Sequence, residues 1–161
     1  MEHKPSSSTN VKDTGSSHET GWEQAWQEQN TPWDTGVPAP ALLQLLNTAT
    51  DLPTGRALVP GCGSGYDAFA LADAGYQVQA VDISQTAVEH FLNLRDQKAY
   101  TPQQVDAHCT DFFSFTPPQP YELIWDYTFL CAIPPSMRDE WAQQMKQLLA
   151  PQGELITLIF P

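Results

Sequence analysis

Residues 58–67 read Leu-Val-Pro-Gly-Cys-Gly-Ser-Gly-Tyr-Asp, an apolar run that gives way to three glycines at alternate positions. A second run, Tyr76-Gln-Val-Gln-Ala-Val-Asp82, follows and ends in a carboxylate. Because glycine has no Cβ, the turn can adopt positive φ and its backbone can approach a ligand closely. The pattern predicts a strand, a turn, a helix and a second strand that bind a nucleotide, with Asp82 accepting hydrogen bonds from a ribose.

The glycine spacing bears on which nucleotide binds. Gly61, Gly63 and Gly65 form Gly-x-Gly-x-Gly, whereas dinucleotide enzymes carry Gly-x-Gly-x-x-Gly. Tyr66 stands where the last glycine of that pattern would be, and its side chain would crowd a pyrophosphate. The spacing therefore favours a ligand without phosphates, and S-adenosylmethionine is the commonest of these. A nicotinamide-dependent oxidoreductase and a tight turn without any ligand are the alternatives.

Outside this stretch, short apolar runs alternate with helical patterns. Strands are expected at residues 56–60, 77–81, 105–109, 121–126 and 153–160, and helices around 21–28, at 40–46, from beyond the glycines to Gly75, after a cap at Ser84, and at 135–149. Such alternation predicts parallel pairing with right-handed crossovers. We therefore expect a doubly wound α/β sheet in the order 3-2-1-4-5, with its ligand at the carboxyl ends of the strands.

Polar and aromatic residues follow two of these strands. Asp111 and Phe112 come after the third strand, where a carboxylate could accept from an adenine amino group and a ring could pack on the base. Equally, Asp111 could cap a helix and Phe112 could belong to the core. Tyr127 comes after the fourth strand, where it could order a substrate or the methionine amino group, or be a core tyrosine with an exposed hydroxyl.

Three tryptophans, Trp22, Trp26 and Trp33, lie in a short segment near the N-terminus. Trp22 and Trp26 are four residues apart, on one face of the predicted helix. An aromatic wall would attract a sulfonium through cation–π interaction and exclude water. Alternatively the rings only hold this segment on the body of the domain, and composition alone favours that alternative.

The composition argues against several partners. The formal net charge is −12, from 7 Lys and Arg against 19 Asp and Glu. Without a basic stripe the chain cannot release counterions from a phosphate backbone, so no nucleic acid partner is expected. No run approaches the roughly 18 apolar residues that span a bilayer, and no apolar signal core is visible. We expect no membrane association and a cytoplasmic location.

The domain organisation also follows from composition. Residues 1–20 carry almost no apolar side chains and are expected to be a disordered tail, because they bury too little surface to offset the entropy of ordering. Residues 21–161 are expected to form a single domain. Cys62, Cys109 and Cys131 are odd in number and widely spaced, which indicates reduced thiols and no metal site.

Several motifs together resemble the thiopurine S-methyltransferase family. They are Trp22-x3-Trp26, Thr31-Pro-Trp-Asp34, Gly55 to Asp67, Val81-Asp-Ile-Ser84, Trp125-Asp-Tyr127 and Gly153-Glu-Leu-Ile-Thr157. The stretch Cys131-Ala-Ile-x-Pro-x-Met-Arg-x-x-Trp-Ala142 is most similar to the halide, thiocyanate and thiol methyltransferases of that family. The likeness extends over residues 21–161.

The resemblance implies a class I, Rossmann-like methyltransferase fold with S-adenosylmethionine as cofactor. It implies contacts to that cofactor from Trp22, Trp26, Trp33, Gly61, Asp82, Asp111 and Tyr127. Gly63, Ile83 and Phe112, next to these positions, complete the predicted cofactor-binding set. It also places Tyr127 and Arg138 as catalytic residues on the substrate side, where the positive charge of Arg138 could attract an anionic nucleophile. A surface salt bridge is the alternative role for Arg138.

The implied reaction is in-line methyl transfer to a small soft nucleophile such as a halide, thiocyanate, bisulfide or thiol. One departure stands against it. Members of the family continue past the fifth strand into an antiparallel hairpin, whereas this sequence stops at Pro161, so a fragment is expected. A catalytically inactive cofactor-binding module is therefore a further alternative. A monomer is expected, with the apolar edge Leu155 to Phe160 as the surface that would pair in a dimer.

Overall fold

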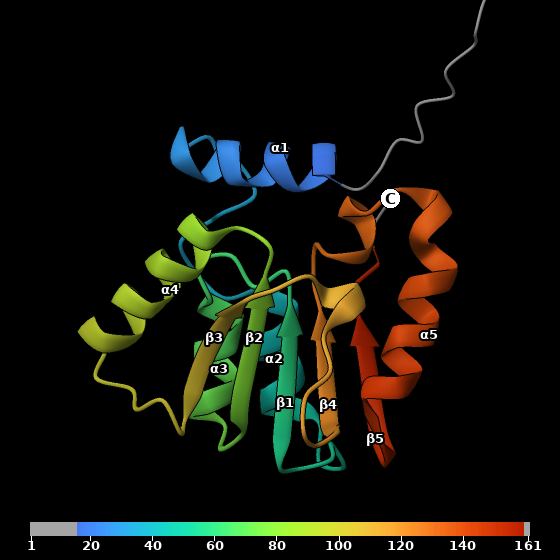
Figure 1. Ribbon diagram of the computed structural model, residues 1–161. Helices are drawn as coiled ribbons and strands as arrows, with labels where there is room; N and C mark the ends of the chain where they lie inside the picture. The colour runs from blue at the N-terminus through green and yellow to red at the C-terminus, as the bar shows by residue number, and fades with distance from the viewer. Residues whose placement is uncertain (1–15, 160–161) are drawn as a thin grey trace, which may run out of the picture.

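The computed structural model describes residues 16–159, which contain a five-stranded sheet with all strands parallel (Figure 1). The strands are β1 (Arg56–Pro60), β2 (Gln77–Asp82), β3 (Val105–Cys109), β4 (Tyr121–Asp126) and β5 (Leu149–Thr157). Their spatial order is β3-β2-β1-β4-β5, which confirms the predicted doubly wound α/β sheet. The order reverses between β1 and β4, and open sheets of this kind bind ligands at that point.

Helices cover both faces of the sheet. They are α1 (Ser16–Gln27), α2 (Pro40–Thr48), α3 (Tyr66–Asp73), α4 (Gln85–Gln97) and α5 (Arg138–Leu148). Alternate residues of β1 show how the two cores divide: Ala57 and Val59 pack in the cluster that holds the buried side chains of α2, α3 and α4, and Leu58 packs with those of α5. This alternation follows from the two-residue period of a strand.

Helix α1 lies across the edge at which the strands end (Figure 1). It begins at Ser16, so the helix of the structure starts within the last residues of the segment predicted to be a tail. Once a helix is held in place by packing, each added residue gains a backbone hydrogen bond, which extends it beyond the packed tryptophans. Residues 1–15, the rest of the predicted tail, lie outside the described part of the chain.

Two predicted boundaries near the C-terminus are corrected. Helix α5 begins at Arg138, after a 3₁₀ turn at Pro135–Met137, and not at Pro135. Strand β5 runs over Leu149–Thr157 and not over residues 153–160. Its pairing with β4 is interrupted between Leu149 and Glu154, and a Cβ at Gly153 would lie 2.7 Å from the Tyr121 carbonyl oxygen. Glycine therefore allows the irregularity that starts the strand earlier than the apolar pattern indicates.

Strand β5 forms one edge of the sheet, as the predicted pairing surface requires. Leu155, Ile156 and Leu158 are half-buried, whereas Ile159 is 80% exposed. Phe160 lies outside the described residues. The predicted apolar edge is therefore exposed mainly at Ile159 in the described part.

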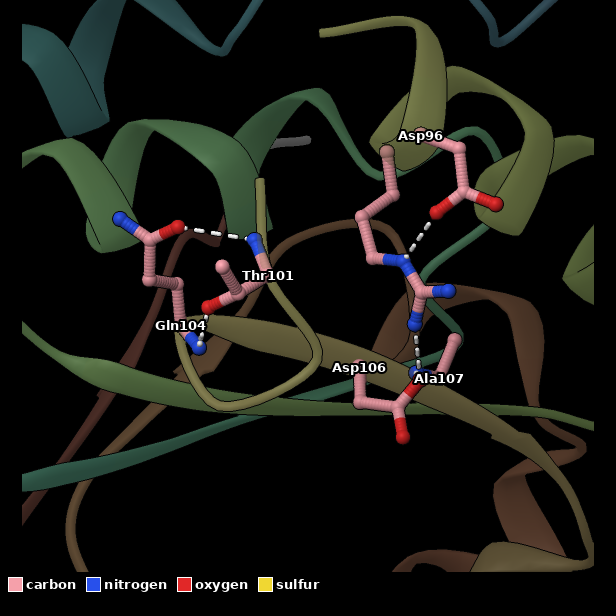
Figure 2. A network of polar contacts seen from close by, with 6 residues as sticks. Asp96, Thr101, Gln104, Asp106 and Ala107 are labelled. Atoms are coloured by element: carbon pink, nitrogen blue, oxygen red, sulfur yellow. Dashed lines mark hydrogen bonds and ion pairs between the residues drawn. The ribbon is translucent and has the colours of Figure 1, made fainter. Parts of the chain in front are cut away.

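Polar contacts fix the connection from α4 to β3 (Figure 2). The Thr101 amide donates to Gln104 Oε1 at 2.8 Å, and the Gln104 amide donates to Thr101 Oγ1 at 3.3 Å. Arg95 of α4 pairs with Asp106 of β3 at 2.7 Å and with the exposed Asp96 at 2.9 Å. These contacts hold the C-terminal end of α4 against β3, and α4 in turn carries His90, whose ring packs on Trp26 beside the site described next.

Candidate functional site

A cavity of about 440 Å³ lies at the carboxyl ends of the strands. All ten residues predicted to contact the cofactor line it: Trp22, Trp26, Trp33, Gly61, Gly63, Asp82, Ile83, Asp111, Phe112 and Tyr127. They come from α1, from the loop after it and from the ends of β1, β2, β3 and β4. Parallel strands bring these distant positions to one edge of the sheet, as the α/β fold predicts.

The glycine turn between β1 and α3 forms the floor of the cavity. Gly63 has φ +50° and Gly65 has φ +90°, a region that other residues rarely adopt. A Cβ on Gly65 would lie 2.2 Å from the Phe91 ring, and one on Gly63 would lie 3.1 Å from Trp26. A side chain at position 65 is therefore excluded by a close contact as well as by backbone conformation, whereas one at position 63 is disfavoured by backbone conformation and would require a small shift of Trp26.

Asp82 stands at the end of β2 and faces both the turn and the cavity. Its Oδ2 accepts from the Gly63 amide at 2.9 Å, and its Oδ1 accepts from the Ser84 amide at 3.0 Å. Burial raises the pKa of this carboxyl, and the backbone hydrogen bonds oppose that rise. Each carboxylate oxygen has a second lone pair, so Asp82 retains capacity to accept from a ligand hydroxyl.

The three tryptophans pack on one another above the turn. The Trp22 and Trp33 ring centroids are 5.3 Å apart at an interplanar angle of 80°, and those of Trp26 and Trp33 are 6.4 Å apart at 69°. Trp26 also lies 6.0 Å from the His90 ring of α4. We call Trp22, Trp26 and Trp33 the aromatic cover. The two sequence interpretations are compatible, because the same rings hold the segment and line the cavity.

Asp111 and Phe112 have the structural roles that the sequence offered as alternatives, and both also line the cavity. Asp111 caps a 3₁₀ turn, accepting from the Phe113 amide at 3.0 Å, and it also lines the cavity. Phe112 is buried in the core and its ring lies 4.9 Å from that of Phe129. A contact of either residue with an adenine ring stays a prediction.

The loop after β4 is shaped by Asp126, a residue for which the sequence analysis gave no role. Its side chain is fully buried, and it accepts from the Phe129 amide at 3.3 Å, the Leu130 amide at 3.1 Å and Trp141 Nε1 at 2.9 Å. Burial raises its pKa above the ordinary value. The adjacent Tyr127 is half-buried in the cavity lining.

Other residues that the sequence analysis did not select complete the site. Asp34 accepts a hydrogen bond from the Ser64 hydroxyl, which ties the loop of Trp33 to the glycine turn. Asp67 accepts from the Ala39 amide at 2.7 Å and from the Trp125 indole at 2.8 Å. An apolar part of the lining consists of Phe113, Phe129, Ile133 and Met137. Asp34, Asp67, Ile133 and Met137 lie in motifs of the family resemblance, but no local pattern indicates their roles here, because the contacts join distant segments.

Arg138 is the predicted residue that the structure does not bring to the cavity. It is exposed at the start of α5, and the neighbouring Met137 supplies the lining there. Within residues 16–159, no three His, Cys, Asp or Glu side chains gather into a group that could hold a metal ion. Among the same residues, no helix is long and apolar enough to cross a membrane.

Solved structures define the class of this fold. Magnesium protoporphyrin IX methyltransferase from Synechocystis PCC 6803, with bound S-adenosylmethionine, has a TM-score of 0.70 at 16% identity, over 88% of this chain and 74% of that chain. A 1,6-didemethyltoxoflavin-N1-methyltransferase from Burkholderia thailandensis has a TM-score of 0.73 at 15% identity, over 95% and 64%. The fold is the class I methyltransferase fold.

Sequence comparison then gives the family. The family model described as thiopurine S-methyltransferase matches residues 17–161, so the chain belongs to that family. "Probable thiol methyltransferase 2" of Arabidopsis thaliana is 48% identical over 145 residues, covering 88% of this chain and 62% of that protein. "Thiocyanate methyltransferase 1" of the same plant is 43% identical over 143 residues, covering 89% and 62%. The resemblance inferred from the motifs is confirmed, and the chain spans 62% of the length of these two relatives.

Proposed function

We propose that the cavity binds S-adenosylmethionine and that the protein transfers the methyl group of this cofactor to a small soft nucleophile. The observation that carries the proposal is the charge of the lining. Four carboxyl groups line the cavity, those of Asp34, Asp67, Asp82 and Asp111, and no Lys, Arg or His is among its described lining residues. Such a site suits a cationic ligand and disfavours a pyrophosphate, which argues against the nicotinamide alternative.

The residues present fit the cofactor in separate parts. Asp82 accepts hydrogen bonds from the ribose hydroxyls. The hydrogen bond that it accepts from the Gly63 amide holds the glycine turn next to this carboxylate. Asp111 and Phe112, which line the cavity after β3, hold the adenine. The aromatic cover shields the sulfonium from water and attracts it through the π faces of the indoles. Tyr127 orders the amino acid end or the substrate.

The cofactor supplies an activated methyl group: its bond to the sulfonium sulfur breaks as the bond to the nucleophile forms, and S-adenosylhomocysteine leaves. The protein contributes orientation and removal of water. Phe113, Phe129, Ile133 and Met137 give the cavity an apolar region in which a thiolate, thiocyanate or halide would lose part of its hydration. No side chain needs to act as a strong general base for nucleophiles that are already anionic.

Thiols and thiocyanate are the substrates that the names of the relatives suggest. Halides and bisulfide extend the same chemistry to other soft anions. We propose that Arg138 attracts the anionic nucleophile. Its side chain is exposed at the first residue of α5. A cytoplasmic location and a monomeric state stay predictions.

Two measurements test the proposed function. Isothermal titration should detect binding of S-adenosylhomocysteine and no binding of NAD. A headspace assay with S-adenosylmethionine should then detect methanethiol from bisulfide, methyl thiocyanate from thiocyanate, or methyl iodide from iodide. Binding of NAD alone would overturn the proposal, and cofactor binding without any methylated product would support the inactive cofactor-binding module.

A further inference from the structure

A carboxylate on α1 contacts the start of α4 next to the cavity. Glu23 Oε2 accepts from the Ser84 hydroxyl at 2.5 Å and from the Thr86 amide at 3.2 Å. Glu23 Oε1 accepts from the Thr86 hydroxyl at 2.5 Å. We call this set of hydrogen bonds the α1–α4 contact. It joins residues 61 and 63 positions apart in the chain, and Glu23 is half-buried within it.

The chemistry of the contact favours an ionised Glu23. Its carboxylate lies at the N-terminus of α4, where the helix dipole and free backbone amides attract negative charge. Hydrogen bonds from Ser84 and Thr86 lower the pKa of Glu23 from its ordinary value of 4.5 to about 2. Ser84 takes part on both sides, because its hydroxyl accepts from the Ala87 amide at 3.0 Å while it donates to Glu23. The carboxylate therefore extends the cap of α4.

The α1–α4 contact lies next to two residues of the aromatic cover, Trp22 and Trp26. Glu23 directly follows Trp22 and precedes Trp26 by three residues, so all three belong to two successive turns of α1. Trp26 lies 6.0 Å from His90, also on α4, and both tryptophans line the cavity. Gln24 and Glu28, by comparison, form an exposed pair of their own on the same segment. Glu23 is thus the charged group of α1 that joins it to the rest of the domain at this point.

The contact also reaches the predicted ribose-binding carboxylate. The Ser84 amide donates to Asp82 Oδ1, and the Ser84 hydroxyl donates to Glu23. One residue therefore holds both carboxylates, one on the cover side and one inside the cavity. Placing α1 and placing Asp82 depend on the same short segment between β2 and α4.

We propose that Glu23 is a positioning residue for cofactor binding: its contact with Ser84 and Thr86 holds α1 so that Trp22 and Trp26 close over the cavity. The expected effect on cofactor affinity rests on the proposed function. The contact of Glu23 with Ser84 and Thr86 does not. Aromatic packing of Trp26 and Trp33 alone could hold α1, and in that case Glu23 would be dispensable. The two possibilities differ in a measurable way.

The experiment uses the full chain, three single variants and one double variant. Glu23→Ala removes the carboxylate, and Thr86→Val removes the hydroxyl donor while it keeps the shape of the side chain. Glu28→Ala is the matched control, since it also removes a carboxylate near α1. Among the described side-chain contacts, the Glu28 carboxylate pairs only with Gln24. Ser84 is left intact, because it caps α4. Hydrogen exchange of α1 amides is measured without ligand, and affinity for S-adenosylhomocysteine is measured by calorimetry.

The expected result is faster exchange of α1 amides in Glu23→Ala and Thr86→Val, with exchange in the sheet unchanged, and an affinity about tenfold lower than that of the original chain. Glu28→Ala should match the original chain in both measurements. The double variant Glu23→Ala with Thr86→Val should lose no more than the stronger single variant, because both remove the same contact.

Two outcomes overturn the inference. One is unchanged exchange of α1 in Glu23→Ala, which would mean that aromatic packing suffices. The other is faster exchange with full affinity, which would mean that the position of α1 does not matter for binding. If the original chain binds no S-adenosylhomocysteine, the proposed function fails, and the exchange data still decide whether Glu23 holds α1.

Discussion

Asp82 accepts a hydrogen bond from the Gly63 amide at 2.9 Å, which joins the end of β2 to the glycine turn after β1. The carboxylate thereby shapes the turn that forms the floor of the cavity and also faces the cavity itself. Glycine at position 63 also leaves room for the aromatic cover, because a Cβ there would lie 3.1 Å from the Trp26 ring. The glycine turn, Asp82 and the aromatic cover are consequently coupled through a few short contacts.

Replacing Asp82 with asparagine should weaken cofactor binding. An amide has one acceptor oxygen, so it cannot accept from the Gly63 and Ser84 amides with separate oxygens as the carboxylate does. Hydrogen bonds to charged groups contribute about 1.5–3 kcal/mol, so affinity for S-adenosylhomocysteine should fall roughly 10- to 100-fold in calorimetry. Asp106→Asn, outside the cavity lining, should leave affinity intact. If the Asp82→Asn variant bound S-adenosylhomocysteine as tightly as the original chain, Asp82 would not be a cofactor-binding residue.

Alanine at Gly65 should destabilise the fold more than alanine at Gly75. Both positions have positive φ, +90° and +98°, so both variants carry the cost of backbone strain. Only at Gly65 would the new Cβ collide with the Phe91 ring, whereas nothing lies within 4 Å at Gly75. Overpacking adds about 1–3 kcal/mol, which urea unfolding would detect as the difference between the variants. Indistinguishable midpoints would show that Phe91 moves aside freely.

Asparagine in place of Asp126 should loosen the loop that carries Tyr127. One oxygen can still accept from the Phe129 and Leu130 amides, but the new amide nitrogen would then face Trp141 Nε1, which is also a donor. Leaving a buried donor unpaired costs about 1–3 kcal/mol in unfolding free energy. Trp141→Phe in the same background should recover part of the loss in a double-mutant cycle. Strict additivity of the two substitutions would contradict this account.

Acid should release α1 through Glu23. Its pKa in the folded protein is about 2, below the ordinary 4.5, so the folded state binds fewer protons than the unfolded state in this interval. The stabilisation is therefore fully present above pH 4.5 and is lost as pH falls towards 2. Tryptophan fluorescence should detect this loss, because Trp22 and Trp26 lie on the same helix.

The Glu23→Gln variant provides the control for this pH dependence. Asp82 and Cys109 are the groups whose pKa values Glu23 raises by its charge, and they occur in both proteins. Subtracting the two pH profiles cancels the titration of groups distant from Glu23, whereas the change in the titration of Asp82 stays in the difference. The stability difference between the two proteins should shrink as pH falls from 4.5. A difference that grows in acid would have the wrong sign for a carboxyl with a lowered pKa.

Local sequence patterns predicted much of the fold. The glycine turn, the Ser84 cap, which accepts from the Ala87 amide, and Asp82 at the end of β2 were all predictable, because each depends on neighbours within a few residues. The strand order followed from the alternation of strands and helices. The early start of β5 was not predictable, since it depends on how close Gly153 comes to the Tyr121 carbonyl of another strand.

The sequence by itself determined the class of fold, the edge of the sheet at which the cavity lies and ten residues that line this cavity. Tertiary structure alone decided that Glu23 caps α4 63 residues away, that Asp126 holds Trp141, and that Arg138 stays outside the cavity. The physical reason is range. Periodicity and turn chemistry act over a few neighbouring residues, whereas these carboxylates find their donors only after the parallel sheet has brought separate loops to its carboxyl edge.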